Sequence, residues 1–158
     1  MKKIAIFLYL SITAYGQDNH LTVKEIDSIV QQIDSTCIRA GVEDYTINEK
    51  GSRKKIGSGA DWYYTDITQT KLLKVISEFS SKSQNIESYY FHQDSLIYLK
   101  LSNISSNKDK KEINWKGQYY FQNNKLIFKQ DNPKSIFKPQ LYLKKAISFF
   151  GTEKIWRK

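Results

Sequence analysis

Histidine, aspartate and serine occur close together in one stretch of the chain, and they are the residue types of a catalytic relay. His92, Asp94 and Ser95 lie within YYFHQDSLIYLK, residues 89–100. A triad requires three side chains that converge on one substrate, and neighbours beside one tight turn cannot converge in this way. Only one other histidine, His20, and one cysteine are present, so no group of residues has zinc-ligand spacing. We therefore expect no catalytic residue, metal or cofactor.

Two further kinds of chemistry are weakly represented. GSG at residues 57–59 lacks the lysine and flanking glycines of a phosphate-binding loop, so we interpret it as a bend. Aspartates and glutamates are scattered along the chain and could meet in space. A small hydrolase with a carboxylate site therefore stays an alternative, although the sequence indicates no particular pair.

The stretch at 89–100 has a near copy, YYFQNNKLIFK, at residues 119–129. In each copy two β-rich runs flank a polar pair, Gln93-Asp94 or Asn123-Asn124, which is typical of a two-residue hairpin turn. The repeat predicts two β-hairpins of the same register. The expected cross-strand pairs are Phe91–Leu96, Tyr90–Ile97 and Tyr89–Tyr98 in the first hairpin, and Phe121–Leu126, Tyr120–Ile127 and Tyr119–Phe128 in the second.

Other segments are expected to extend the same sheet. Trp62-Tyr63-Tyr64 precedes LLKVISEF, for which we favour a strand, although residues 70–79 also have helical spacing of apolar residues. Tyr45–Ile47 and Lys55-Ile56 are predicted to form a short ribbon around EKGSR. The polar run SNISSNKDKK, residues 102–111, is predicted to be an exposed loop between hairpins.

Helices are expected near both ends. Residues 22–40 carry apolar side chains at helical spacing, Thr22 and Glu25 form a capping box, and Gly41 would end the helix. Cys37 is expected to be buried on the apolar stripe of this helix; the alternative is a disulfide between two chains. After Pro139, the run QLYLKKAISFF predicts a short helix that ends before Gly151, and the tail TEKIWRK is expected to be loose.

Together these patterns predict one α+β domain over residues 17–158. It would consist of an N-terminal amphipathic helix packed on an antiparallel β-meander of about 5–7 strands built from repeated hairpins, followed by a short C-terminal helix.

The first sixteen residues resemble a Sec-type signal peptide. Two lysines precede the apolar run 4–12, which is too short to span a bilayer, and small residues then precede a cleavage site between Gly16 and Gln17. A buried strand or an uncleaved anchor is the alternative. No later segment is apolar enough to cross a membrane. We expect the mature chain to be periplasmic or extracellular.

Charge is distributed unevenly along the chain. Residues 17–99 contain nine Lys/Arg and twelve Asp/Glu, whereas residues 100–158 contain fourteen and four. The basic last third could attract an acidic protein, an anionic polymer or lipid headgroups. Export argues against nucleic acid. The alternative is ordinary solvated lysine.

The aromatic residues supply the candidate binding surface. The expected register places Tyr89, Phe91, Leu96 and Tyr98 on one face of the first hairpin, and Tyr90, Ile97 and Leu99 on the other. Both faces would then be apolar, so either other elements cover them or one of them is a binding platform. The platform would consist of Trp62, Tyr63, Tyr90, Trp115, Lys116 and Tyr120. The sequence thus favours a non-enzymatic binding or protein-interaction module, inhibitor- or immunity-like, with an envelope glycan or polyanion as the alternative ligand.

Overall fold

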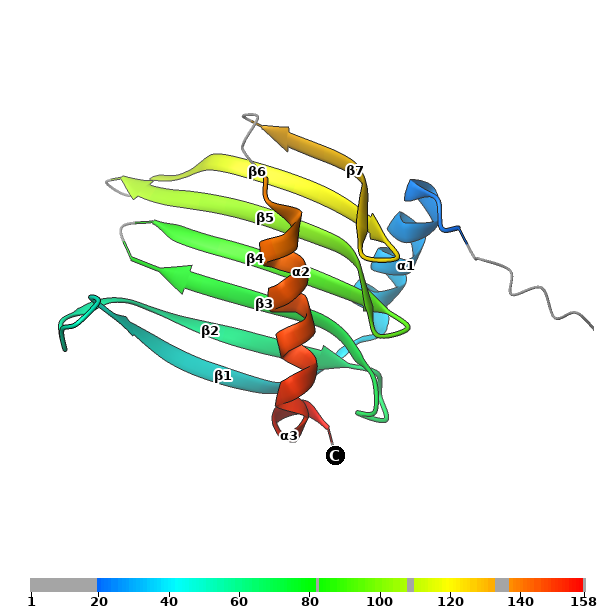
Figure 1. Ribbon diagram of the computed structural model, residues 1–158, viewed down its shortest axis with the longest axis horizontal. Helices are drawn as coiled ribbons and strands as arrows, with labels where there is room; N and C mark the ends of the chain where they lie inside the picture. The colour runs from blue at the N-terminus through cyan, green and yellow to red at the C-terminus, as the bar shows by residue number, and fades with distance from the viewer. Residues whose placement is uncertain (1–19, 82, 108–109, 133–136, 158) are drawn as a thin grey trace, which may run out of the picture.

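The computed structural model describes residues 20–157, apart from residues 82, 108–109 and 133–136. The predicted signal segment, residues 1–16, and its cleavage site lie outside these residues. One helix precedes a seven-stranded antiparallel sheet and a helical segment follows it, so the α+β fold and the C-terminal helix are confirmed (Figure 1). The elements are α1 Val23–Thr36, β1 Ile38–Asn48, β2 Lys55–Thr65, β3 Leu72–Ser80, β4 Gln84–His92, β5 Ser95–Asn107, β6 Lys110–Gln122, β7 Lys125–Asn132, α2 Pro139–Ser148, η1 Phe149–Thr152 and α3 Glu153–Trp156.

The sheet is a simple meander in which every strand pairs with its neighbours in the sequence. The two predicted hairpins are β4–β5 and β6–β7. Their turns, Gln93-Asp94 and Asn123-Asn124, have positive φ at both residues, between 49° and 58°. Such turns match the right-handed twist of the strands, and Asn and Asp tolerate this backbone region better than other side chains.

The predicted register is correct only beside each turn. Phe91 pairs with Leu96 as expected, but the next pair is Tyr90 with Tyr98, so Ile97 is an extra residue on β5. The second hairpin repeats this irregularity, because Tyr120 pairs with Phe128 and Ile127 is extra. Each hairpin therefore contains a β-bulge, in which two residues of one strand oppose one residue of the other.

The bulge also corrects the predicted faces of the sheet. Ile97 and Tyr98 both lie on the α1 side, packed with Tyr90, whereas Leu99 lies on the α2 side with Tyr89. A one-residue offset reverses the face of every residue beyond it. Tyr98, Leu99 and Phe128 therefore lie on the faces opposite to those predicted.

Three further predictions concern the middle of the chain. Residues 72–80 form strand β3, which confirms the strand rather than the helix, and the ribbon around EKGSR is the β1–β2 hairpin. The predicted loop at 102–111 is wrong, because β5 extends to Asn107 and β6 starts at Lys110. The Asn103 side chain, in this segment, has a partner on the neighbouring strand β4: its amide donates to the Asn85 oxygen at 2.7 Å.

Helix α1 begins as predicted and ends earlier. The Thr22 and Glu25 capping box is present, with the Thr22 N–H donating to Glu25 Oε2 at 2.7 Å. The helix stops at Thr36 rather than near Gly41, so Cys37 is the C-cap and is half-buried. Gly41 lies in β1, where a Cβ atom would come within 2.3 Å of the Ile155 carbonyl oxygen. This glycine therefore permits α3 to approach the sheet.

The side of the sheet that faces α1 contains a tyrosine cluster. Ile26 and Ile33 of α1 are buried against it. Its members are Tyr90, Ile97, Tyr98 and Tyr120. The Tyr90 hydroxyl donates to Asp34 at 3.2 Å and the Tyr120 hydroxyl donates to Asp27 at 2.8 Å, so each ring buries its apolar part and keeps a polar partner on the helix.

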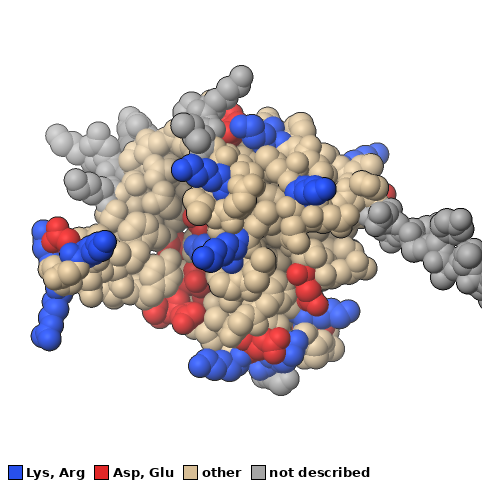
Figure 2. Space-filling view, viewed as in Figure 1, with Lys and Arg blue, Asp and Glu red and all other residues tan. Residues whose placement is uncertain are grey.

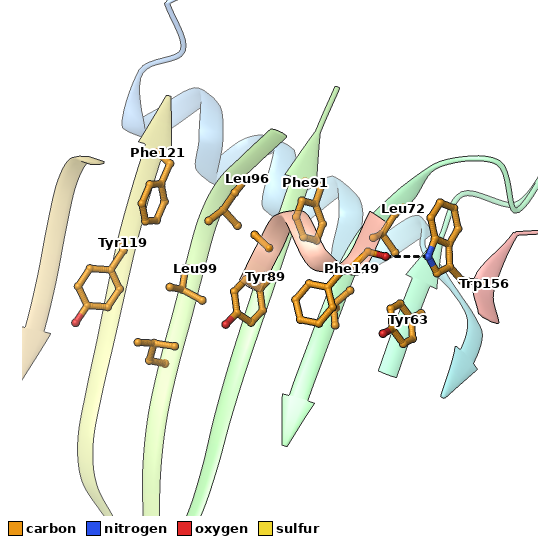
Figure 3. Packing of buried hydrophobic residues seen from close by; sticks show 13 residues of the cluster. Tyr63, Leu72, Tyr89, Phe91, Leu96, Leu99, Tyr119, Phe121, Phe149 and Trp156 are labelled. Atoms are coloured by element: carbon orange, nitrogen blue, oxygen red, sulfur yellow. Dashed lines mark hydrogen bonds between the residues drawn. The ribbon is translucent and has the colours of Figure 1, made fainter. Parts of the chain in front are cut away.

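The C-terminal segment covers the other face. Pro139 is at the start of α2 as predicted, but the helical path continues past Gly151 through η1 and α3. The prediction of a loose tail is wrong, because Trp156 is 2% exposed and its indole N–H donates to the Phe149 carbonyl at 3.3 Å. Figure 3 shows Phe149 and Trp156 over the row of buried side chains from the strands. None of the helices in the described part of the chain is long and apolar enough to cross a membrane.

The two bulge residues give a matched pair for mutation. Ile97 is 4% exposed and Ile127 is 43% exposed, although they occupy the same place in the repeat. We expect Ile97→Ala to lower the free energy of unfolding by about 2–5 kcal/mol, and Ile127→Ala to lower it by less than about 1 kcal/mol. Urea unfolding of both variants measures the difference. Equal losses would contradict the difference in burial between the two isoleucines.

Candidate interaction surfaces

Half of the predicted aromatic platform is buried. Tyr63 lies in the core under the C-terminal segment, and Tyr90 and Tyr120 lie under α1. The expectation that these three rings are exposed is wrong, because a helix covers part of each face of the sheet (Figure 1).

The other three predicted residues do not meet. Trp62 faces the α1 side, half-buried, with the Arg39 guanidinium 5.1 Å from its ring centre. It lines an open hollow of about 420 Å³ together with Asp44, Glu78 and other residues of β1–β4. Lys116 is exposed on β6, four strands from β2. Trp115 packs on the opposite face, against the core of the α2 side.

On the α2 side, strand pairing builds a row that the sequence did not predict. Glu43 pairs with Asp61, Asp61 with Ser77, and Ser77 with Glu87, so four strands place these residues side by side. We call them the acid row. Asp61, Ser77 and Glu87 are each two residues away from a core residue on the same strand, respectively Tyr63, Val75 and Tyr89. Residues two apart in a strand point to the same face, so the acid row lies on the core face of the sheet. Figure 2 shows acidic side chains gathered beside the C-terminal helices.

Lys145 of α2 bonds to this row. Its ammonium group lies 2.7 Å from Glu87 Oε2 and donates to the Ser77 hydroxyl oxygen at 2.8 Å. The Tyr89 hydroxyl donates to the same Glu87 oxygen at 2.6 Å. The ammonium also lies 5.7 Å from the centre of the Tyr89 ring. The helix is thereby fixed to the sheet by charge-assisted hydrogen bonds at the edge of the apolar core.

Burial changes the protonation chemistry around this bond network. Desolvation raises the pKa of Asp61, and only its hydrogen bond with Ser77 and the charge of Lys145 oppose this. Asp61 Oδ1 is a buried oxygen without a hydrogen-bond partner among the described residues. Desolvation, together with the Glu87 charge, also raises the pKa of Tyr89 far above its ordinary value. The acid row thus contains three carboxylates and contacts a single ammonium group, in surroundings that are partly shielded from water.

A second row lies outside the acid row and borders a cavity. The pairing continues through Tyr45, Gly59, Phe79, Asn85, Asn103 and Trp115, which we call the outer row. A cavity of about 230 Å³ lies where these two rows meet α2. Its side-chain lining includes Phe79, Asn85, Glu87, Trp115, Tyr142 and Lys145. Only Trp115 among these residues was singled out by the sequence, because the others come together through pairing of distant strands.

Strand β7 forms a different kind of surface. It is the last strand of the sheet, and no strand in the described part of the chain pairs with its outer edge. Ile127 and Phe128 are both exposed there, at 43% and 45%. Their counterparts in the first hairpin, Ile97 and Tyr98, are 4% and 5% exposed. The Tyr98 ring lies 4.9 Å from the Tyr120 ring of the following strand, whereas β7 is the last strand of the described sheet and Phe128 has no such neighbour there.

No family model matches the chain, and no curated protein or solved structure matches it either.

Proposed function

We propose that this chain is an exported, non-enzymatic protein-interaction module that holds a protein partner along strand β7. One observation carries the proposal. In the first hairpin the bulge isoleucine, Ile97, and the aromatic residue after it, Tyr98, are buried. In the second hairpin the equivalent residues, Ile127 and Phe128, are both exposed. Adjacent exposed apolar residues on an open edge strand form a surface to which another protein can add a strand or a helix. The signal-like N-terminus supports an envelope or secreted partner.

The charge beside this edge favours an acidic partner. Lys125 and Lys129 are exposed on β7, and the Lys129 ammonium lies 3.6 Å from Asp131. The last third of the sequence has an excess of lysine. Such charge accelerates association with an acidic surface, while the apolar contacts of Ile127 and Phe128 would provide most of the affinity.

Affinity capture tests the proposal. Residues 17–158 carrying a removable tag are incubated with envelope extract from the source cell, washed at low and high salt, and the retained proteins are identified by mass spectrometry. We expect one protein in near-stoichiometric amount after the high-salt wash. The double variant Ile127→Lys/Phe128→Lys should retain about a tenth of it or less, because lysines at the edge expose charge where apolar contacts form.

A matched control separates this surface from general effects of added charge. Ile67 and Ile147 are exposed in the β2–β3 turn and on α2, away from β7. Ile67→Lys/Ile147→Lys should retain the partner as the unchanged chain does, and circular dichroism should show that both double variants are folded. Equal retention by all three proteins would contradict the β7 interface. Retention that disappears at high salt would favour the anionic-polymer alternative.

A further inference from the structure

The cavity beside α2 has no lining residue on β7, and its chemistry differs from that of the β7 edge. Its floor comes from β3 to β6 and one wall comes from α2. Phe79, Leu101, Trp115 and Tyr142 contribute apolar and aromatic side chains to its lining. Polar groups contribute a similar share, from residues that include Asn85, Glu87 and Lys145. Small-molecule sites combine apolar and aromatic side chains with polar groups that fix the orientation of the ligand, and this cavity offers both kinds.

The polar groups offer a strong donor and a strong acceptor side by side. Lys145 and Glu87 are in contact at 2.7 Å, and their side chains keep exposed fractions of 37% and 25%. An ammonium group has three protons, of which two have the partners Ser77 and Glu87. A carboxylate has two oxygens, and the contacts of Lys145 and Tyr89 are both with Oε2 of Glu87. A hydroxyl group is both donor and acceptor, so it can bond to both side chains.

Net charge on the ligand is disfavoured by the same arrangement. An anionic group would approach Lys145 but also Glu87, Asp61 and Glu43 of the acid row. A cationic group would approach Glu87 but also the ammonium of Lys145. A neutral ligand with several hydroxyl groups avoids both repulsions and uses charge-assisted hydrogen bonds.

Amide groups continue beyond the cavity along the sheet. The Asn103 amide donates to Asn85 Oδ1 at 2.7 Å, and the Asn114 amide donates to Asn103 Oδ1 at 2.8 Å. Ser105 donates to Asn114 at 3.0 Å. Asn114 and Trp115 are neighbours at a bulge in β6, which brings this hydrogen-bonded chain next to the indole. A ligand longer than the cavity would therefore continue over amide groups rather than over apolar surface.

We propose that this cavity binds one ring of a neutral saccharide. The ring would lie with its C–H face against the aromatic wall of Trp115 and Tyr142, and its hydroxyl groups would bond to Lys145, Glu87 and Asn85. The volume of about 230 Å³ is below the range of drug-sized pockets, which suits a single ring. The next ring of an oligosaccharide would contact the Asn103 and Asn114 amides. This site does not depend on the β7 interface.

Titration with defined sugars tests the inference. Cellotriose and tri-N-acetylchitotriose are the probes, and intrinsic tryptophan fluorescence and calorimetry are the readouts. We expect saturable binding of at least one probe, with a Kd that is the same at low and high salt because the ligand is uncharged. Glu87→Gln and Tyr142→Ala should each raise the Kd about tenfold, the loss of one charged hydrogen bond or one ring contact.

Two variants assign the signal to this cavity. Trp115→Phe should remove the fluorescence change and weaken binding, whereas Trp62→Phe, on the opposite face, should leave the Kd unchanged. Tyr142 lies half-buried on α2, so its variant remains informative if Glu87→Gln impairs folding. No binding of either probe at 10 mM would overturn the proposal, as would binding that is lost in Trp62→Phe and kept in Trp115→Phe and Tyr142→Ala.

Discussion

Replacing Trp156 with alanine is expected to lower the free energy of unfolding by about 3–5 kcal/mol. The side chain is 2% exposed and belongs to the larger core cluster, although only two residues follow it in the sequence. Its removal would leave a cavity between α3 and the sheet, and the Phe149 carbonyl would lose its hydrogen bond with the indole. Both losses affect the C-terminal helical segment, which should therefore pack less stably on the sheet.

Urea unfolding followed by circular dichroism measures this effect. Ile147→Ala is the matched control, because Ile147 is exposed on the same helical path and its truncation should change stability by about 0.5 kcal/mol or less. A Trp156 variant as stable as this control would show that the tail does not pack on the sheet. That result would also restore the expectation of a loose C-terminus.

The double substitution Ile26→Ala/Ile33→Ala should expose the tyrosine cluster to water. Both isoleucines are buried against Tyr90, Tyr98 and Tyr120, and each truncation should cost about 2–5 kcal/mol of the free energy of unfolding. Helix α1 should therefore separate from the sheet before the sheet itself unfolds. The three hydroxyl groups would then lose the apolar surroundings that the helix provides.

Alkaline titration detects this exposure. Desolvation raises the pKa of Tyr98 to about 12 and also raises the pKa values of Tyr90 and Tyr120, whose hydrogen bonds to Asp34 and Asp27 add to the shift. A tyrosine pKa that is higher in the folded state stabilises the fold fully below the unfolded value of about 10. That stabilisation is lost as the pH rises from about 10 towards the folded value.

The expected spectra differ in a simple way. In the unchanged chain, absorbance at 295 nm should show that the cluster stays protonated beyond pH 11 and ionises on alkaline unfolding. In the double variant, three more tyrosines should titrate near pH 10. Gln32→Ala, on the exposed part of α1, is the control and should titrate as the unchanged chain does. Identical titration of the double variant would mean that α1 does not cover the cluster.

The sequence by itself determined the features that depend on a few neighbouring residues. Asn123-Asn124 and Gln93-Asp94 define their turns because both positions need positive φ. Thr22 with Glu25 fixes the start of α1, and Pro139 fixes the start of α2, because each satisfies or removes free donors of its own first turn. The repeat also correctly predicted two hairpins with matching registers, but it did not predict the bulge that both of them contain.

Tertiary structure alone decided the features that join distant strands. The bulges at Ile97 and Ile127 reversed the predicted faces of the residues beyond them. One extra residue in a strand places every residue that follows it on the opposite side of the sheet. The polar character of residues 102–111 did not prevent strand formation. The Asn103 side chain, for example, has hydrogen-bond partners on β4 and β6. Gly41 does not end a helix as predicted. It lies in a strand, where the absence of a side chain leaves space for the carbonyl oxygen of Ile155, more than a hundred residues away in the sequence.

The candidate sites divide in the same way. The apolar edge at Ile127 and Phe128 is present in the sequence as a repeat, but its exposure follows from the absence of a neighbouring strand among the described residues. The acid row and the cavity beside Lys145 have no local pattern at all. Their residues lie in four or more strands and a helix, and only hydrogen-bonded register places Asp61, Ser77 and Glu87 side by side.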